Sequence, residues 1–247
     1  MKKILKIIKV IIAIIILTLI FAVATLIYKG YNVYKNALNQ ISISDKVKEI
    51  QEKENYTKLD EMPEFYLNAV IAVEDRRFYN HGAVDIVSLA RACWVNVKAM
   101  ELKEGGSTIT QQLAKNIYFT QEKSALRKIA EFFMAFEIEK ECDKNTILEL
   151  YLNTSYFGDG YYCVADASEG YYDKKPIDMN RNEASMLAGI PNAPSAYCPT
   201  KHLKLAKQRQ IQVLDKMVKY NFINEDEKEE ILQESNAVVE KTIDKKK

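Results

Sequence analysis

The sequence predicts a mostly α-helical protein, with one helical domain behind a single N-terminal membrane helix. Residues 10–27 form an uncharged apolar run, later apolar residues recur at helical spacing, and no segment alternates apolar and polar residues as a half-buried strand would. Lys+Arg 35 balance Asp+Glu 34 in the 247 residues. The net charge of +1 therefore gives no reason to expect a nucleic-acid partner or a charge-driven disordered chain.

The first element is a membrane anchor, expected over residues 1–29. Four lysines precede the apolar run, which as a helix is about 27 Å long, close to the thickness of the hydrocarbon core. The positive-inside rule then keeps the N-terminus in the cytoplasm and exports residues 30–247. A cleaved signal peptide is the alternative, because Ala22-Val23-Ala24 resembles a small-residue cleavage site.

Three further segments follow the anchor. Residues 30–57 are rich in Lys, Glu and Asn with little helical periodicity, and we interpret them as a helical stalk or linker. The domain is expected over residues 58–235, which is enough chain for one hydrophobic core. Residues 236–247 are expected to form a polar tail.

The domain begins with a helix that opens at Pro63 and ends abruptly at Glu74-Asp75-Arg76-Arg77, so that a buried helix presents charges at its end. Gly105-Gly106 breaks the next helical stretch, and Thr108 with Gln111 has the spacing of a capping box for another helix. Further helices are predicted over residues 124–141, 144–153, 182–190 and 203–220.

Helix 124–141 has two different sides. Ile129, Phe132, Phe133 and Phe136 form one apolar stripe, and Arg127, Lys128 and Glu131 lie opposite. Such charges are often an ordinary surface ion-pair set. Here they accompany the acidic cluster at Glu74 and a polar stretch between the two, and together these side chains make an inventory for group transfer. The polar stretch contributes Gln111, Gln112, Lys115 and Lys123.

The balance of charges favours one kind of transfer. A glycosidase needs a protonated carboxylic acid to help a sugar hydroxyl leave. A pyrophosphate leaves as an anion, so cations replace the acid and one carboxylate is left to accept a proton. Cations outnumber carboxylates in residues 111–128, which favours a phosphate-bearing donor, and the membrane anchor suggests that the donor is a lipid.

Cysteines and histidines give no metal site. The four cysteines are widely spaced without a C-x-x-C pair, and His81 and His202 are the only histidines. We expect no metal ligands and no prosthetic group, with a divalent cation such as Mg²⁺ as an optional aid to pyrophosphate neutralisation. His81 is expected to hold Asp85 or its loop.

Five segments together resemble, in order, the five motifs of the peptidoglycan glycosyltransferase family. They are EDRRFYNHGAVD (74–85), GGSTITQQLAKN (105–116), RKIAEFFMAFEIE (127–139), ILELYLNTSYFGDG (147–160) and EASMLAGIPNAPSAYCP (183–199). The resemblance covers about residues 58–235. The family includes the glycosyltransferase module of bifunctional penicillin-binding proteins and monofunctional membrane-anchored transglycosylases. Because no S-x-x-K motif is present and the sequence ends at 247, the monofunctional type is the expected match.

The resemblance implies a lysozyme-like, bilobal helical domain with a cleft. It implies that Glu74 is the general base on the acceptor hydroxyl and that Glu131 is the second essential glutamate. Lys115 and Lys128 match residues associated with the donor pyrophosphate, and Lys123 stands where many relatives carry arginine, so it keeps the charge but loses the bidentate fork. The other expected substrate-binding residues are Asp75, Phe78, Ser107, Thr108, Gln112 and Arg127.

The implied reaction is polymerisation of glycan strands from lipid II with release of undecaprenyl pyrophosphate. Implied partners are lipid II, the nascent glycan strand, the bilayer, and transpeptidases or other cell-wall synthesis proteins, and moenomycin is expected to bind. The segment with Trp94, Val97 and Met100 is expected to dip into the bilayer interface, with core packing as the alternative. Two other functions stay open: a lysozyme-like lytic muramidase, and a catalytically silent membrane-anchored scaffold.

Overall fold

The structure is a computed structural model that describes residues 2–101, 105–120, 122 and 124–234. The described residues contain helices, turns and loops but no strand. The α-helices are α1 Lys2–Gln40, α2 Ile43–Gln51, α3 Glu64–Glu74, α4 Ile86–Ala99, α5 Ile109–Tyr118, α6 Ala125–Glu141, α7 Lys144–Leu152, α8 Val164–Tyr172, α9 Arg181–Gly189, α10 Pro194–Tyr197, α11 Pro199–Lys219 and α12 Glu225–Gln233. The predicted mostly α class is confirmed.

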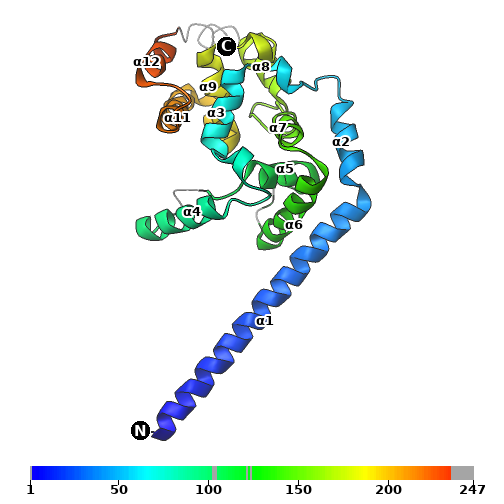
Figure 1. The fold of residues 1–247 in the computed structure, drawn as a ribbon, viewed down its shortest axis with the longest axis vertical. Coiled ribbons are helices and arrows are strands. Elements are labelled where there is room, and N and C mark those ends of the chain that lie inside the picture. Colours follow the sequence, from blue (N-terminus) through cyan, green and yellow to red (C-terminus); the bar gives the residue numbers. More distant parts are fainter. Residues whose placement is uncertain (1, 102–104, 121, 123, 235–247) are drawn as a thin grey trace.

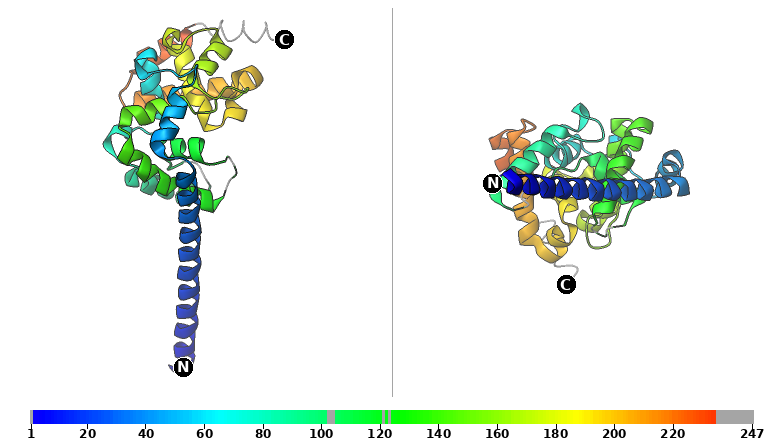
Figure 2. Two further views of the ribbon diagram at one scale, coloured as in Figure 1. Left: turned by 90° about the vertical axis from the view of Figure 1, so that its right-hand side faces the viewer. Right: turned by 90° about the horizontal axis from the view of Figure 1, so that it is seen from below.

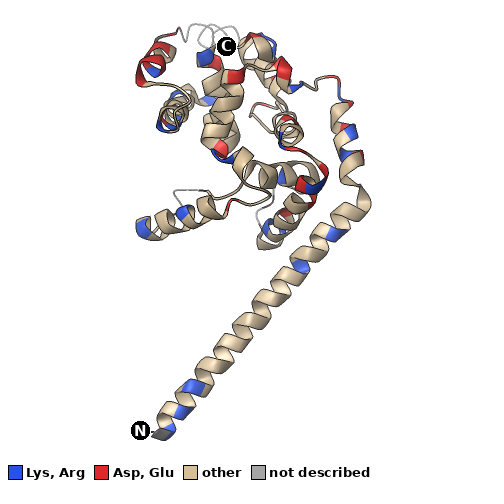
Figure 3. Cartoon of the chain, in the orientation of Figure 1, with Lys and Arg blue, Asp and Glu red and all other residues tan. Residues whose placement is uncertain are grey.

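Helix α1 leaves the domain as a long straight rod (Figures 1 and 2). It is long and apolar enough to cross a membrane once, and its most apolar window contains no buried residue. Lysines lie near both ends of the helix, with a long uncharged section between them (Figure 3). The chain therefore carries an N-terminal helix suited to a single membrane crossing.

The C-terminal part of α1 is packed against the domain. Gly30 and Tyr34 are buried, and α1 packs along α6. Residues 30–40, expected within a stalk, are thus a continuous extension of the apolar helix that contacts the domain. The expected limits at residues 29 and 57 stay predictions, as does the polar tail at residues 236–247, which lies outside the described residues.

The domain that follows α1 in the chain has two lobes (Figure 1). The larger lobe is built around α3, which buries residues 69–73 and packs on α9 and α11. The smaller lobe contains α4, α5 and α6, with α5 packed on both α6 and α7. This arrangement is consistent with the predicted lysozyme-like bilobal class, and the ends of α3, α5 and α6 come together where the lobes meet.

Helix α4 is sparsely covered by the rest of the domain, and Ala92 is its one buried residue. Asp85 caps its first turn by accepting a hydrogen bond from the Ser88 backbone N–H. Its large apolar side chains lie in the open, with Trp94 72% exposed. In Figure 1 the helix lies at the lower edge of the domain, on the side from which α1 leaves. Core packing, the alternative interpretation of this segment, does not hold for Trp94, Val97 and Met100.

Candidate functional site

A cleft of about 650 Å³ lies between the two lobes. Its walls are the C-terminal end of α3, part of α4, the loop at residues 105–108, α5, α6 and α11. Glu74 and Glu131 both line it, although they lie far apart in the sequence. The two carboxylates expected to carry the chemistry therefore share one groove.

Glu74 is the last residue of the buried helix α3, and its side chain is only 6% exposed. Its Oε2 accepts a hydrogen bond of 2.8 Å from Gln112 Nε2 of α5. Its Oε1 is buried and has no hydrogen-bond partner among the described residues, with the guanidinium of Arg209 at 3.9 Å. One oxygen is thus held by Gln112, and the other lies beside Arg209 without a hydrogen bond from the described residues.

Glu131 is held differently. Its side chain is 1% exposed and forms ion pairs with Arg127 Nε at 2.8 Å and Lys128 Nζ at 2.7 Å. The spacings i, i+4 and i, i+3 put all three on one side of α6. Lys128 also donates to Ser107 Oγ at 2.9 Å, which ties the helix to the 105–108 loop. Glu131 therefore organises two cations at the cleft wall.

Lys115 of α5 completes the group of basic side chains at this wall. Burial lowers the pKa of its ammonium group; the positive charges of Arg127 and Lys128 act in the same direction, and the Glu131 carboxylate opposes them. The positive charges of these neighbouring side chains repel one another. The cleft wall is accordingly suited to an anionic ligand that would neutralise them.

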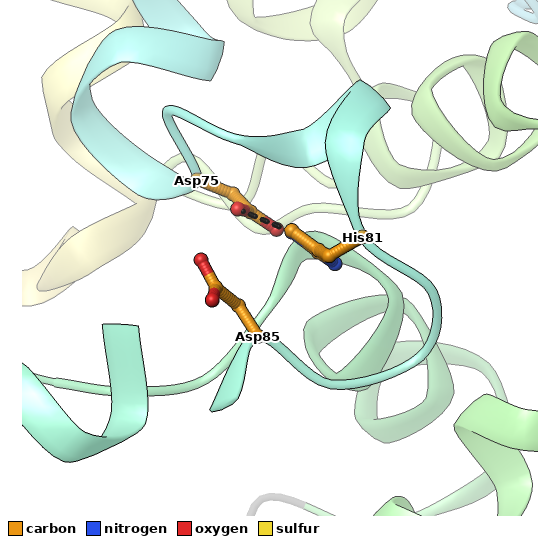
Figure 4. Close-up of side chains that lie close together, drawn as sticks. All are labelled: Asp75, His81 and Asp85. Atoms are coloured by element: carbon orange, nitrogen blue, oxygen red, sulfur yellow. Dashed lines mark hydrogen bonds and ion pairs between the residues drawn. The ribbon is translucent and has the colours of Figure 1, made fainter. Parts of the chain in front are cut away.

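Asp75 joins three segments at the base of the cleft. Its Oδ1 lies 2.7 Å from His81 Nε2 (Figure 4). Its Oδ2 accepts a hydrogen bond of 3.1 Å from the backbone N–H of Ile109 at the start of α5. His81 thus contacts Asp75 and not Asp85, and its Nδ1 lies 2.6 Å from the Gly82 carbonyl oxygen, which agrees with the expectation that it holds its own loop. Burial alone would lower the pKa of His81, but the hydrogen bond and charge of Asp75 outweigh it and raise the pKa.

Asp75, His81 and Asp85 present ligand atoms within 4.8 Å of one another, a set that a metal ion accepts (Figure 4). Each is already engaged by the protein, however. Arg77 forms an ion pair with Asp85 and, through its hydrogen bonds, holds the pKa of that carboxyl well below its usual range. Asp85 also caps α4. We therefore interpret this cluster as a structural clamp between α3, α4 and α5.

The structure brings most of the expected site residues to the cleft. Thr108 caps α5 in the predicted capping box with Gln111 and donates to the Ala83 carbonyl at 2.8 Å. The expected residues that line the cleft are Glu74, Asp75, Ser107, Thr108, Gln112, Lys115, Arg127, Lys128 and Glu131.

Two expected site residues do not join them. Phe78 is fully buried in the hydrophobic core, with the Lys144 ammonium 4.6 Å from its ring centroid. Its expected place on the cleft wall is therefore corrected: a large aromatic side chain next to α7 gains more from core packing than from exposure in a polar groove. Lys123 lies outside the described residues.

Arg209 and Lys216 of α11 are cleft residues that the sequence analysis missed. Arg209 is 8% exposed and donates to the Gly189 carbonyl, and Lys216 donates to the Val73 carbonyl at 2.9 Å near the end of α3. A signal was present in the sequence. Arg209 falls at helical spacing with the buried residues Ala206 and Val213, and an arginine on a buried face needs a partner.

Comparison with known proteins agrees with this site. Residues 42–218 match the sequence model of the transglycosylase family, and the chain belongs to that family. Penicillin-binding protein 1A of Neisseria flavescens is 42% identical over 184 residues, 74% of this chain and 23% of that protein. Penicillin-binding protein 1A of Aquifex aeolicus is 42% identical over 179 residues, 72% of this chain and 25% of that protein.

The chain spans about a quarter of the length of these curated relatives. A crystal structure of penicillin-binding protein 1A from Haemophilus influenzae is also similar, at 22% identity, with a TM-score of 0.43 over 73% of this chain and 17% of that one. A TM-score below 0.5 is too low to support a shared fold. Family membership therefore rests on the sequence match.

Proposed function

We propose that this protein is a peptidoglycan glycosyltransferase that polymerises glycan strands from lipid II. The observation that carries the proposal is the pair of unlike carboxylates in one cleft. Glu74 has an oxygen without a hydrogen-bond partner among the described residues, and Glu131 is paired with cations on the facing wall. Membership of the transglycosylase family supports the same reaction class.

In this reaction the 4-hydroxyl of the acceptor GlcNAc gives its proton to Glu74 Oε1. The oxygen of this 4-hydroxyl then attacks the anomeric carbon of the donor from the face opposite the pyrophosphate. The new glycosidic bond forms as the bond from carbon to the pyrophosphate oxygen breaks, so the α linkage of the donor becomes β. Gln112 holds the other Glu74 oxygen, Oε2, and so fixes the direction of the Oε1 lone pair that takes the proton.

The leaving group takes the bonding electrons as undecaprenyl pyrophosphate. Lys115, Arg127 and Lys128 would bind its oxygens, so that no protonated acid is needed at this side. Glu131 forms ion pairs with Arg127 and Lys128 and would hold both side chains in position at the cleft. No prosthetic group takes part, and a divalent cation such as Mg²⁺ would only add to the neutralisation of the pyrophosphate.

The membrane arrangement follows from α1. The lysines before the apolar section would keep the N-terminus in the cytoplasm, with the domain on the outer face of a bacterial cell membrane. Exposed apolar side chains on α4 would then contact the bilayer beside the lipid-linked substrate. The nascent glycan strand would be the other partner, with transpeptidases or other cell-wall synthesis proteins as further partners.

A lytic muramidase is the second candidate, because the same helical class can cut glycan. Glycoside hydrolysis uses one carboxyl group as an acid next to a second carboxylate. Here the second carboxylate, Glu131, has both oxygens engaged by cations, and the wall beside it is basic. A silent scaffold would have no use for a buried Glu74 oxygen that lacks a hydrogen-bond partner among the described residues. Both observations favour the polymerase.

Replacement of the base tests the proposal. We expect Glu74→Gln to lower lipid II polymerisation by at least ~100-fold, since removal of a general base typically costs that much or more. The measurement is a gel of glycan products from purified full-length protein. The matched control is Glu64→Gln, an exposed position at the other end of α3. Polymerisation by Glu74→Gln at a rate near that of the control would refute the role of Glu74.

A further inference from the structure

Helix α1 crosses α6 at very short range at Gly30. A Cβ atom at this position would lie 2.5 Å from Ile129 Cγ2 and 3.2 Å from the Leu126 carbonyl oxygen. Contacts below 3.0 Å do not persist without a shift of one partner. The crossing therefore depends on a residue without a side chain, and it places the backbone of α1 directly on α6.

The contact continues beyond Gly30. The Phe133 ring of α6 lies edge-on to the Tyr31 ring, with 5.3 Å between the ring centroids, and stacks on the Tyr34 ring, with 5.8 Å between the centroids. Tyr34 is 2% exposed and donates a hydrogen bond of 3.0 Å to Glu137 Oε1. Such a set of aromatic contacts and a hydrogen bond exceeds what a flexible tether needs, because a tether has only to limit the distance from the membrane.

Helix α6 carries the cation pair of the cleft on a different face. Leu126, Ile129 and Phe133 meet α1, while Glu131 faces the cleft. Arg127, Lys128 and Glu131 lie within two residues of Ile129 on this helix, so a displacement of the backbone at Ile129 also displaces them. Helix α5 is tied to the same region, because Tyr118 donates to the carbonyl of Ile41 just after α1.

We propose that residues 30–41 are a positioning part of the cleft, and that the close crossing at Gly30 sets where α6 holds Arg127, Lys128 and Glu131. This inference rests on the proposed function and adds a second task to the anchor helix. Membrane attachment and placement of the cations are then separate properties of α1, one in its apolar section and the other in its C-terminal turns.

A bulky residue at the crossing tests the idea in the full-length protein. We expect Gly30→Leu to lower kcat for lipid II polymerisation by ~10-fold or more, because small misplacements of catalytic groups have effects of that size. The matched control is Ala24→Leu, which adds the same side chain to an exposed position of the same helix. It should polymerise at the wild-type rate.

A compensating change distinguishes positioning from damage. Ile129→Ala removes the side chain that a leucine at position 30 would meet, so the double variant Gly30→Leu/Ile129→Ala should recover most of the lost rate. If Gly30→Leu does not fold, Tyr34→Phe replaces it. That change removes one hydroxyl group, and it should lower kcat by ~3-fold or more with KM unchanged.

Amide hydrogen exchange in α6 gives a readout that does not depend on activity. Exchange over residues 127–137 should rise in Gly30→Leu and return toward wild type in the double variant. If the wild-type protein makes no glycan, the proposed function fails while the exchange still decides the inference. Wild-type exchange in Gly30→Leu, or a rate loss that Ile129→Ala does not reverse, would overturn it.

Discussion

At the residue scale, Glu74 and Glu131 are both buried carboxylates that differ in what holds their oxygens. Gln112 engages one oxygen of Glu74 and the Arg209 guanidinium lies 3.9 Å from the other, whereas both oxygens of Glu131 lie within 2.8 Å of cations. A base needs a lone pair that faces the substrate, and an ion-paired carboxylate organises charge instead. The residue types alone do not separate these roles. The family resemblance assigned them from the sequence, and the different partners are consistent with that assignment, which stays a prediction.

Lys115 leads to a prediction about alkaline pH. Because burial and nearby cations lower its pKa, it should lose its charge below the ordinary lysine value of about 10.4. We therefore expect kcat/KM for polymerisation to fall at alkaline pH as Lys115 loses its proton, which gives the pH profile an alkaline limb. Lys115→Arg, which stays charged to much higher pH, should move the limb upward. Lys204→Arg, an exposed α11 position, is the control. Identical limbs in all three proteins would exclude Lys115 as the group that titrates.

His81 leads to a prediction about stability. Its pKa is raised in the folded protein by Asp75, so the pair stabilises the fold fully below the unfolded histidine value of about 6.5. That contribution is lost as pH rises through the raised pKa. Thermal unfolding of wild type and His81→Gln should therefore differ most at about pH 5.5 and least at about pH 9. A difference in melting temperature that does not vary with pH would contradict this role.

At the element scale, strong periodicity and caps were enough to find several helices. The predicted helix 124–141 is α6, with Ser124 as its cap, and the capping box at Thr108 begins α5. The helix predicted from residue 203 is the main part of α11, which is kinked at His202, where the backbone is non-helical. The first turn before this kink opens with Pro199 and lies outside the predicted helix.

Helices α8 and α12 were not predicted. Helix α8 mixes aromatic, acidic and glycine residues without a clear stripe, and it is held by burial of Tyr171 and Tyr172. Helix α12 is strongly charged, and tertiary packing of Ile231 fixes it. A capping box of Asn224 with Glu227 was present as a signal. In both segments tertiary packing stabilises a helix whose local pattern was not recognised in the sequence.

At the scale of the whole molecule, the cleft unites parts of the chain that are far apart in sequence. Helices α3, α5 and α6 bring the expected residues, and α11 adds Arg209 from far beyond the end of α6 in the sequence. Helical periodicity predicts which face of each helix is buried but not which helices meet. The family resemblance supplied that information for the motif residues, and it named neither Arg209 nor Lys216.

The exposed side of α4 gives a prediction about the membrane. Trp94 is the single tryptophan of the chain, so its fluorescence reports this helix alone. In vesicles that contain the full-length protein, lipids with brominated acyl chains should quench it. The control is Trp94→Phe/Tyr162→Trp, which moves the tryptophan to an exposed position between α7 and α8 and should not be quenched. Equal quenching in both proteins, or none in either, would contradict bilayer contact by α4.

The central claim is that the cleft builds glycan because a pyrophosphate can leave from its basic wall without a protonated acid. The most direct measurement offers the purified protein lipid II and finished, uncrosslinked glycan strands in parallel and follows the products of each. The account predicts β-linked strands that lengthen from lipid II with release of the lipid pyrophosphate, and no shortening of the finished glycan. Cleavage of the finished strands, with lipid II left unpolymerised, would contradict it.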